Sequence, residues 1–455
     1  MTGFTIKDVV SACGGTYFGD NAALTEEITD IVTDSRRAAP GCIFAAIAGE
    51  RVDGHDFIPA ALGAGALCSI CSKRDTDGNR IVVESVPAAL QSIAAEYRGR
   101  FSIPVVGITG SVGKTTTKEM VWSVLSQRFN TLKTQGNFNN ELGVPLTLFG
   151  LDGNHEAAVV EMGISHFGEM DRLAGMVRPD VALISNIGFA HLEFLGDRAG
   201  VLREKADILS HSGKESVLIV NGDDDMLSSY DAGVQKISYG VEDGCNVRAE
   251  NVRAMGLDGI ECEIVIGDRR IGVRIPSFGF HMVSAALAGA AVGAYFGLSD
   301  EEIKRGIENY KAVGRRSSVC NTGLYTLIDD CYNSNPTSLA SSLSSIAMLD
   351  SRRVCILGDM KELGEGARDL HREMGRLCAK LGMSLLITCG ELSECYGEGA
   401  MQEENAPVVW HFPDREELIA MLPHLLIKGD AILVKASNSM GFDKISEAIK
   451  ELAVE

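Results

Sequence analysis

The chain has 455 residues, 45% of them hydrophobic and 50 of them glycine, and at roughly 150 residues per domain this length predicts about three domains with their own cores. The composition is that of a globular α/β protein, in which glycines serve the many turns between strands and helices. The formal net charge of −20 disfavours nonspecific binding to nucleic acid or to an anionic membrane, because both need a basic surface.

The N-terminus and the cysteines both predict a reducing compartment. Residues 1–7 lack the basic and apolar regions of a signal peptide, and charges interrupt every apolar run that approaches membrane-spanning length. The 12 cysteines are scattered, mostly within apolar segments, which favours reduced and buried thiols. Cys68 and Cys71 have the spacing of half a zinc site, but no second pair with that spacing exists. We therefore expect a cytoplasmic protein that does not enter a membrane. A monomer is the expected state, although the sequence itself does not define the oligomeric state.

Residues 1–100 are expected to form a small α/β domain. The segment 31–36 leads into a turn at Pro40 and Gly41 and then into a buried strand over 42–47. Residues 54–58 are expected to open a helix. A new apolar strand begins shortly after Arg100, which places a domain boundary there.

The most informative segment follows that boundary. An apolar strand over 105–108 runs into a glycine-rich turn and then into an expected helix over 114–128. Backbone N–H groups at such a helix start bind phosphate, Lys114 can reach the terminal phosphates, and the Thr115 hydroxyl can ligate Mg²⁺. The common pattern has glycine where Ile108 stands, so this is a shorter variant of the loop. The expected site for a nucleoside triphosphate consists of Thr109, Gly110, Ser111, Val112, Gly113, Lys114, Thr115 and Thr116.

Residues 101–313 alternate strands and helices, which predicts a doubly wound, mostly parallel sheet with ligands at the carboxyl ends of its strands. Glu161 ends one apolar strand and suits Mg²⁺ as a hard oxygen ligand. His191 follows the strand over 181–187, and both a metal-ligand role and a hydrogen-bonded structural role fit it. Lys205, beside acidic residues on a helix, fits a solvated ion pair. Residues 235–275 are short alternating strands that indicate an antiparallel edge or subdomain.

Residues 314–455 restart the alternation and predict a Rossmann-like domain without a dinucleotide fingerprint. Its four expected strands are 325–329, 353–357, 385–388 and 431–434. At the preceding domain junction, Arg315 could reach across to a triphosphate.

Two polar segments are candidates for substrate recognition. Three amides within four residues suit peptide or sugar groups, although a capped turn before a helix also fits them; they are Asn137, Asn139 and Asn140. Residues 329–336 follow a strand and offer carboxylates for ribose hydroxyls and amides for a substrate backbone. The candidates in this second segment are Asp330, Tyr332, Asn333 and Asn335.

Together these segments resemble the Mur ligases of cell-wall synthesis over nearly the whole chain. The most specific stretches are 135–143, 160–163, 329–336 and 357–364, while 33–36 and 49–57 resemble the uridine-nucleotide domain of the family. Within the family, the pattern is most similar to the member that joins D-alanyl-D-alanine to UDP-N-acetylmuramoyl-tripeptide. These two molecules are therefore the expected binding partners, with ATP and Mg²⁺ as cofactors.

The resemblance also implies a reaction and a set of site residues. ATP would phosphorylate the C-terminal carboxylate of the tripeptide, and the dipeptide amine would then attack the acyl phosphate. The implied catalytic residues are Lys114, Glu161, His191 and Lys205, the last being carbamylated so that it joins Thr115, Glu161 and His191 as a metal ligand. His281 and Arg315 would bind the nucleotide, and Thr33, Asp34, Ser35 and Arg36 would bind the substrate. The implied domains are 1–100 for the nucleotide-sugar peptide, 101–313 for ATP and 314–455 for ligation.

Some positions depart from the family pattern, and others separate this chain from related enzymes. His281-Met282 stands where the family usually has His-Asn, and residues 435–438 read Lys-Ala-Ser-Asn where it tends to have Lys-Gly-Ser-Arg. A ligase that adds the third stem-peptide residue would carry an arginine after Asn335-Pro336, where this chain has Thr337. A folylpolyglutamate synthase shares the loop but not the N-terminal domain. A phosphate-loop regulatory or motor ATPase fits this acidic, repeat-free chain less well.

Overall fold

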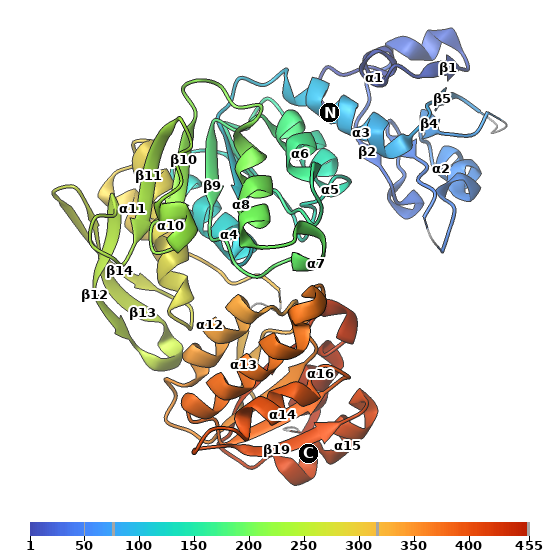
Figure 1. The fold of residues 1–455 in the computed structure, drawn as a ribbon. Helices are drawn as coiled ribbons and strands as arrows, with labels where there is room; N and C mark the ends of the chain where they lie inside the picture. Colours follow the sequence, from blue (N-terminus) through green and yellow to red (C-terminus); the bar gives the residue numbers. More distant parts are fainter. Residues whose placement is uncertain (50, 75–77, 315–317, 453–455) are drawn as a thin grey trace. The chain divides into compact units, whose positions relative to one another are not determined.

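The computed structural model describes residues 1–49, 51–74, 78–314 and 318–452. It is a mixed α/β protein with three sheets, of five, nine and six strands, which confirms the expected fold class (Figure 1). By their internal contacts the residues fall into two compact units. One unit comprises Met1–Thr109, Phe129–Leu183 and Lys205–Val217, and the other comprises Gly110–Arg128, Ile184–Glu204 and Leu218–Glu455.

The first sheet is formed by the N-terminal residues and has the strand order β1-β5-β4-β3-β2. Its strands are β1 (Thr16–Phe18), β2 (Ile31–Val32), β3 (Ile43–Ala45), β4 (Cys68–Cys71) and β5 (Arg80–Val82). Only the β1–β5 pair is antiparallel, and the other three pairs are parallel. The expected turn and buried strand after Pro40 are confirmed as β3.

Three α-helices accompany this sheet: α1 (Ile6–Cys13), α2 (Ile58–Gly63) and α3 (Val86–Arg98). The helix expected from Gly54 begins as a single 3-10 turn over Gly54–Phe57, and α2 starts only at Ile58. Pro59 lies in the first turn of α2, where its fixed φ fits and its missing N–H is not needed. Ile58 and Ala61 of α2 pack in a core with Phe44 of β3.

The second sheet has the strand order β14-β13-β12-β11-β10-β9-β6-β8-β7. Its strands are β6 (Val105–Thr109), β7 (Thr131–Lys133), β8 (Ala157–Glu161), β9 (Val181–Ile184), β10 (Val217–Asn221), β11 (Gln235–Gly240), β12 (Val247–Ala254), β13 (Ile260–Ile266) and β14 (Arg269–Ile275). β8 pairs in parallel with β6 and with β7. β9 ends at Ile184 rather than Ile187, because Ser185 and Asn186 turn away to hydrogen bond with the residues after β6.

The antiparallel edge expected over 235–275 is confirmed for its last three strands, whereas β11 pairs in parallel with β12. β12, β13 and β14 pair antiparallel at one end of the sheet. In β14, Ile271, Val273 and Ile275 are buried while the residues between them are exposed, as in a strand with one covered face.

Helices follow most strands of the second sheet. They are α4 (Lys114–Leu125), α5 (Gly143–Phe149), α6 (Glu169–Val177), α7 (Leu192–Leu195), α8 (Arg198–Ala206), α9 (Asp225–Ser228), α10 (His281–Tyr295) and α11 (Asp300–Glu308). α4 ends at Leu125 rather than at the expected Arg128, because the N–H groups of Gln127 and Arg128 hydrogen bond three residues back instead of four. α11 packs closely on α4 at Gly306, where a Cβ would lie 2.5 Å from the Cα of Val124.

The third sheet has the order β15-β16-β20-β17-β18-β19 and confirms the expected Rossmann-like region. Its strands are β15 (Ser318–Asn321), β16 (Thr326–Asp329), β17 (Arg353–Gly358), β18 (Leu385–Cys389), β19 (Val408–Phe412) and β20 (Ala431–Lys435). All pairs are parallel except β15–β16. The four expected strands are confirmed, and the two edge strands β15 and β19 are additional.

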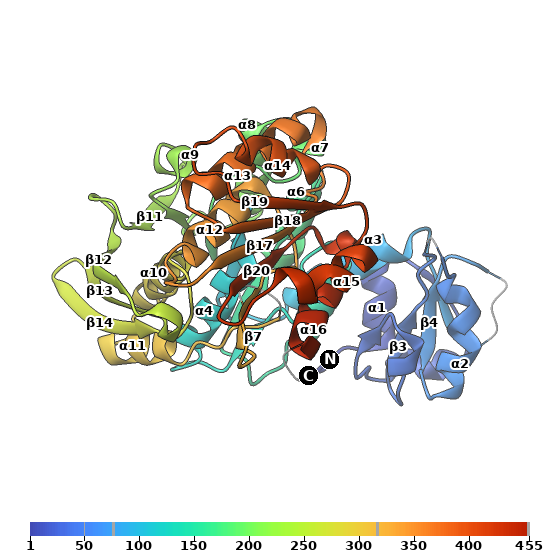
Figure 2. The ribbon, with the colours of Figure 1, turned by 90° about the horizontal axis from the view of Figure 1, so that it is seen from below.

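Helices cover both faces of this third sheet (Figure 2). They are α12 (Pro336–Ile346), α13 (Ala367–Lys380), α14 (Glu394–Ala400), α15 (Arg415–Leu425) and α16 (Asp443–Leu452). Cys355 and Leu357 of β17 pack in one core with α12, α13 and α14, whereas Val354 and Ile356 pack in a second core with α15 and α16. This alternation is the period of two that a strand buried on both faces requires.

No helix within the described ranges is both long enough and apolar enough to cross a membrane. All 12 cysteines are free, and most of them are buried. Burial and the neighbouring thiols of Cys42 and Cys71 raise the pKa of Cys68 to about 12. Cys68 and Cys71 are the first and last residues of one buried strand, β4, so their side chains point to opposite faces of the sheet and the spacing reflects the strand.

Candidate nucleotide and ligation site

The glycine-rich turn between β6 and α4 is held by the residues that follow β9. The N–H of Val112 donates to Asn186 Oδ1 at 2.9 Å, and the N–H of Ser111 donates to the Asn186 carbonyl at 3.1 Å. The Ser185 hydroxyl donates to the Val112 carbonyl at 2.6 Å. The loop conformation is therefore fixed by hydrogen bonds within the protein.

Gly110 is required by this arrangement. Its φ is 150°, and a Cβ at this position would lie 2.0 Å from Ser185 Oγ. We expect Gly110→Ala to displace the loop and to raise the Kd for ADP about 100-fold. A small displacement moves the backbone N–H groups of the loop out of hydrogen-bonding position for the phosphates. Titration calorimetry checks this, with Gly153→Ala as a control, since nothing lies within 4 Å of a Cβ there. An unchanged Kd in Gly110→Ala would contradict a nucleotide site at this loop.

The start of α4 has the features of an anion site. Gly113 is the N-cap residue, with a left-handed φ of 80°, and the helix begins at Lys114. The first N–H groups of a helix find no acceptor within it, and the helix dipole favours negative charge there. Lys114 Nζ donates to the Gly110 carbonyl at 2.7 Å, so the lysine lies over the loop, and Thr115 is buried. The predicted residues of the phosphate loop thus share one turn and helix start.

Glu161 lies at the carboxyl end of β8, next to the strand that leads into this loop. It is opposite Ile108 of β6 in the strand pairing and is 1% exposed. Its N–H donates to the Thr134 hydroxyl at 3.0 Å, and Asn139 Nδ2 donates to its Oε1 at 2.7 Å. The carboxylate is therefore oriented, and carboxylate and hydroxyl oxygens are the donors that Mg²⁺ prefers. Glu161 and Thr115 both suit this metal by the chemistry of their oxygens.

The amide-rich segment before α5 combines two kinds of contact. Asn140 Oδ1 accepts from the N–H of Leu142 at 3.2 Å and of Gly143 at 2.8 Å, which caps the turn before α5. Asn139 contacts Glu161 as described, and Asn137 is exposed. The capped turn considered from the sequence is therefore present, and substrate contacts of the three amides stay a prediction.

The side chains of His191 and Glu362 are in contact, and both residues have an unusual backbone conformation. Nδ1 of His191 lies 2.6 Å from Oε2 of Glu362, and φ is 56° for the histidine and 63° for the glutamate. A left-handed conformation costs a residue other than glycine about 1–3 kcal/mol, so the surroundings must hold both residues in place. A cavity of about 1030 Å³ adjoins this contact, and Phe189, Glu193 and Lys361 are among its lining residues. The hydrogen-bonded role considered for His191 is thus present, and metal binding by it stays a prediction.

Lys205 is not on the surface. It is 1% exposed and its neighbour Glu204 is 2% exposed, so the expectation of a solvated ion pair is wrong. Acidic neighbours usually indicate a solvent-exposed helix face, but this part of α8 is buried. Burying an ammonium requires compensation by an anion or a chemical change of the amine. Among the described residues no set of three or more His, Cys, Asp or Glu side chains converges as a metal site.

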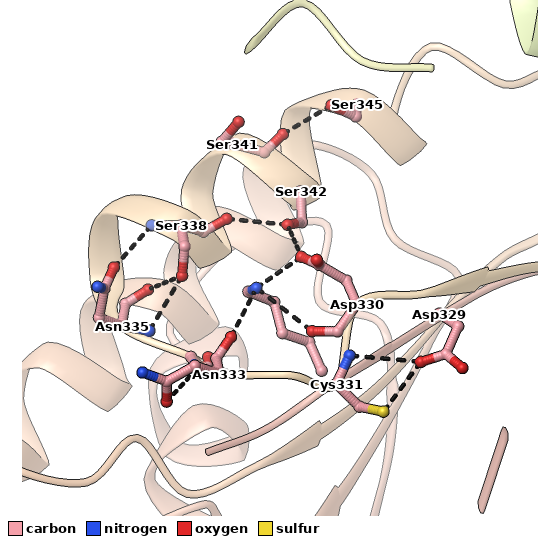
Figure 3. Close-up of polar contacts among 11 residues, drawn as sticks. Asp329, Asp330, Cys331, Asn333, Asn335, Ser338, Ser341, Ser342 and Ser345 are labelled. Atoms are coloured by element: carbon pink, nitrogen blue, oxygen red, sulfur yellow. Dashed lines mark hydrogen bonds and ion pairs between the residues drawn. The ribbon is translucent and has the colours of Figure 1, made fainter. Parts of the chain in front are cut away.

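The loop after β16 is held by a polar network that reaches β20 and α12 (Figure 3). Lys435 Nζ donates to Asp330 Oδ2 at 2.5 Å and to the Asn333 carbonyl at 3.0 Å. The Ser342 hydroxyl donates to the same Asp330 oxygen at 2.6 Å. Side chains from two other elements therefore set the conformation of this loop.

Asn335, at the end of the loop, begins α12. Its Oδ1 accepts from the N–H of Ser338 at 2.8 Å, and its own N–H donates to Ser338 Oγ at 3.0 Å, which is a capping box. Tyr332 is half-buried and Asn333 is exposed. The structure thus gives Asn335 a helix-capping contact, and substrate contacts of these three residues stay predictions.

His281 is the first residue of α10 and lies near the Asp330–Lys435 pair. Its pKa is below the ordinary value because burial disfavours the charged ring, an effect that Asp330 opposes and Lys435 reinforces. Its Nδ1 is buried and makes no hydrogen bond with any described residue. A neutral ring nitrogen of this kind suits contact with a nucleotide base. Arg315, the other residue expected to bind the nucleotide, lies outside the described residues.

The Thr33–Arg36 segment forms a small turn in the N-terminal region. The Asp34 carboxylate accepts from the N–H of Arg36 at 3.0 Å and from its Nε at 2.9 Å. These hydrogen bonds lower the pKa of Asp34 to about 2. Thr33 and Ser35 are half-buried and Arg36 is exposed, so polar groups of this turn face solvent. Binding of a uridine nucleotide here stays a prediction.

Sequence reasoning missed two residues that shape the site. Asn186 anchors the phosphate loop, and Lys435 anchors the loop after β16. A signal for both existed, because each lies at the carboxyl end of an apolar strand and the carboxyl ends of parallel strands meet at one edge of a sheet.

Three segments of the chain match domains of a single family. Residues 27–98 match the Mur ligase family catalytic domain, residues 108–293 the Mur ligase middle domain, and residues 314–438 the Mur ligase glutamate ligase domain. The chain therefore belongs to the Mur ligase family, and the resemblance seen in its motifs is confirmed.

Full-length relatives refine this result. The UDP-N-acetylmuramoyl-tripeptide–D-alanyl-D-alanine ligase of Bacillus subtilis is 33% identical over 461 residues, which cover 98% of this chain and 98% of that protein. The crystal structure of MurF from Acinetobacter baumannii is 32% identical, has a TM-score of 0.90, and covers 98% of this chain and 99% of its own. MurF ligase from Thermotoga maritima in complex with ADP is 27% identical, with a TM-score of 0.83 and coverage of 93% and 97%.

Proposed function

We propose that this protein is an ATP-dependent ligase that joins D-alanyl-D-alanine to UDP-N-acetylmuramoyl-tripeptide, releasing ADP and phosphate during the synthesis of peptidoglycan precursors. The observation that carries the proposal is the match over 98% of the chain to a relative of that name. The ADP complex of the Thermotoga maritima relative supports ATP as the nucleotide. Thr337 after Pro336 favours this reaction over addition of the third stem-peptide residue.

The reaction needs activation of a carboxylate, which is a poor acyl donor. Transfer of the γ-phosphoryl group of ATP to the C-terminal carboxylate of the tripeptide gives an acyl phosphate. Attack by the dipeptide amine gives a tetrahedral intermediate, which expels phosphate and leaves the amide bond. Lys114 and the N–H groups at the start of α4 would bind the phosphates through both steps, and no protein nucleophile is required.

The oxygen donors of the site support Mg²⁺ as the metal. Thr115 and Glu161 would hold it, and the Asn139 hydrogen bond supports the orientation of Glu161. His191 and a carbamylated Lys205 would complete the ligands, and the burial of Lys205 supports a form of its amine other than a solvated ammonium. When bound, Mg²⁺ supplies positive charge to the transferring phosphoryl oxygens.

We assign the remaining roles by region. Residues 1–100 would bind the nucleotide-sugar peptide through Thr33–Arg36, and residues 101–313 would bind ATP. Residues 314–455 would form the ligase domain, in which Asp330 binds the ribose and the 332–335 segment contacts the peptide. The protein would act as a monomer in the cytoplasm.

An assay that omits one substrate at a time tests the proposal. We expect phosphate release from ATP to stay near background until both the nucleotide tripeptide and D-alanyl-D-alanine are present. Mass spectrometry should then show the nucleotide peptide heavier by one dipeptide. The lysine-containing and the diaminopimelate-containing tripeptides are assayed in parallel, because they differ only in the third residue.

The alternatives give different results in the same assay. Addition of a single amino acid to the nucleotide dipeptide would identify the ligase of the preceding step, and glutamate addition to a folate would identify a folylpolyglutamate synthase. Turnover of ATP without any peptide would indicate a stand-alone ATPase and overturn the proposal.

A further inference from the structure

Lys435 is a buried lysine at the carboxyl end of the third sheet. It is the last residue of β20, opposite Leu357 of β17, and its neighbour Val434 is opposite Asp329 of β16. Lys435 is 2% exposed. Its side chain therefore ends where the loop after β16 begins.

The ammonium of Lys435 is directed at that single loop. It donates to Asp330 Oδ2 at 2.5 Å, to the Asn333 carbonyl at 3.0 Å and to the Asp330 carbonyl at 3.5 Å. An ammonium has three protons, and here all the acceptors lie within four residues of one another. The Lys435 side chain thus holds both Asp330, at the start of the loop, and Asn333, three residues further along.

The Asp330 side chain is held from two directions. Lys435 of β20 and Ser342 of α12 donate to the same oxygen, Oδ2. Two donors on different elements prevent rotation of the carboxylate. Hydrogen bonds to a charged group are stronger than those between neutral groups, above all where little water is present. The orientation of the other oxygen, Oδ1, is then also determined.

We propose that Lys435 is a positioning residue of the nucleotide site: it orients the Asp330 carboxylate and holds the 330–333 loop in the form that binds the ribose. The inference rests on the proposed function, in which Asp330 binds the nucleotide. Lys435 itself acts through Asp330 and not by contact with ATP.

The chain offers a matched structural control on the same strand. Asp430, immediately before β20, is fully buried and accepts from Arg352 Nη1 at 3.1 Å. This ion pair lies at the amino end of the strand, away from the carboxyl edge where ligands bind in parallel sheets. Loss of either basic partner leaves a buried carboxylate uncompensated, so both losses destabilise the protein.

The experiment compares Lys435→Met with Arg352→Met in the full-length protein. We expect both variants to lower the Tm by several degrees. Only Lys435→Met should raise the Kd for ADP and the KM for ATP, by about 10- to 100-fold, the usual effect of losing hydrogen bonds to a charged group. The KM for the nucleotide tripeptide and for D-alanyl-D-alanine should change less than about twofold in Arg352→Met.

Two further variants keep the test decisive when Lys435→Met does not fold. Lys435→Arg keeps the charge and should recover part of the affinity for ADP, whereas Ser342→Ala removes the second donor to Oδ2 and should weaken ADP binding by a smaller factor of about 3 to 10. A lower Tm with unchanged nucleotide affinity in the lysine and serine variants would show a purely structural role and overturn the inference.

Failure of the proposed function gives a different pattern. In that case the wild-type protein itself binds no ADP and forms no amide, whatever the variants do. Wild-type ligation combined with unchanged nucleotide affinity in Lys435→Met overturns only the role of Lys435.

Discussion

Replacing Lys114 by alanine should lower the rate of ligation about 1,000-fold, with little loss of stability. The side chain lies over the phosphate loop, with Nζ 2.7 Å from the Gly110 carbonyl, and is half-buried rather than part of a core. A preorganised charge that stabilises phosphoryl transfer lowers the barrier by about 4 kcal/mol, which corresponds to this factor. The effect should appear in kcat/KM for ATP, measured with both peptide substrates at saturation.

A surface lysine provides the control for this experiment. Lys304 of α11 donates to the Gly272 carbonyl at 2.7 Å and pairs with Glu308 at 3.0 Å, so Lys304→Ala removes a charge without touching the loop. Its activity should stay within about twofold of the wild type, because exposed pairs of this kind contribute little. Substantial ligation by Lys114→Ala would exclude the Gly110–Thr116 loop as the ATP site.

Replacing Glu161 by glutamine should abolish turnover or raise the Mg²⁺ concentration required for it about tenfold or more. Glutamine keeps the size of the side chain and an oxygen that can accept from Asn139, so the change isolates the negative charge. A neutral amide oxygen is a weaker ligand for a hard divalent cation than a carboxylate. Initial rates measured against Mg²⁺ at fixed ATP report the shift.

The opposite end of the same strand supplies the matched variant. Glu156 immediately precedes β8, and its Oε2 accepts from the N–H of Asn130 at 2.9 Å on the exposed side of the protein. Glu156→Gln should leave the Mg²⁺ dependence unchanged. If Glu161→Gln also kept the wild-type dependence, Glu161 would have no part in metal binding.

Much of the fold could be predicted from local patterns. Long apolar runs bounded by turn residues identified β6, β8, β9 and the four inner strands of the third sheet, since strands buried on both faces read as continuous apolar segments. The two edge strands were missed for different reasons. Ser318–Asn321 is short and mixed and has no pattern that distinguishes it from a loop, whereas Val408–Phe412 carries strand-favouring residues that sequence reasoning overlooked.

The phosphate loop could also be predicted, because its chemistry lies in consecutive residues. The parts of the site that depend on distant residues could not. Asp330 and Lys435 are 105 positions apart, and only the parallel pairing of β16 with β20 brings them together. Lys205 was misread for a similar reason, since its burial is set by packing and not by its charged neighbours.

The placement of β20 has a consequence for how the C-terminal region comes apart. β20 lies between β16 and β17, its residues are buried, and an ion pair closes each end of it, Arg352–Asp430 and Lys435–Asp330. Opening the strand from either end must separate a buried carboxylate from its basic partner, whereas β19 at the sheet edge can fray without that penalty. Amide hydrogens of β20 should therefore exchange with deuterium only when the whole region melts cooperatively.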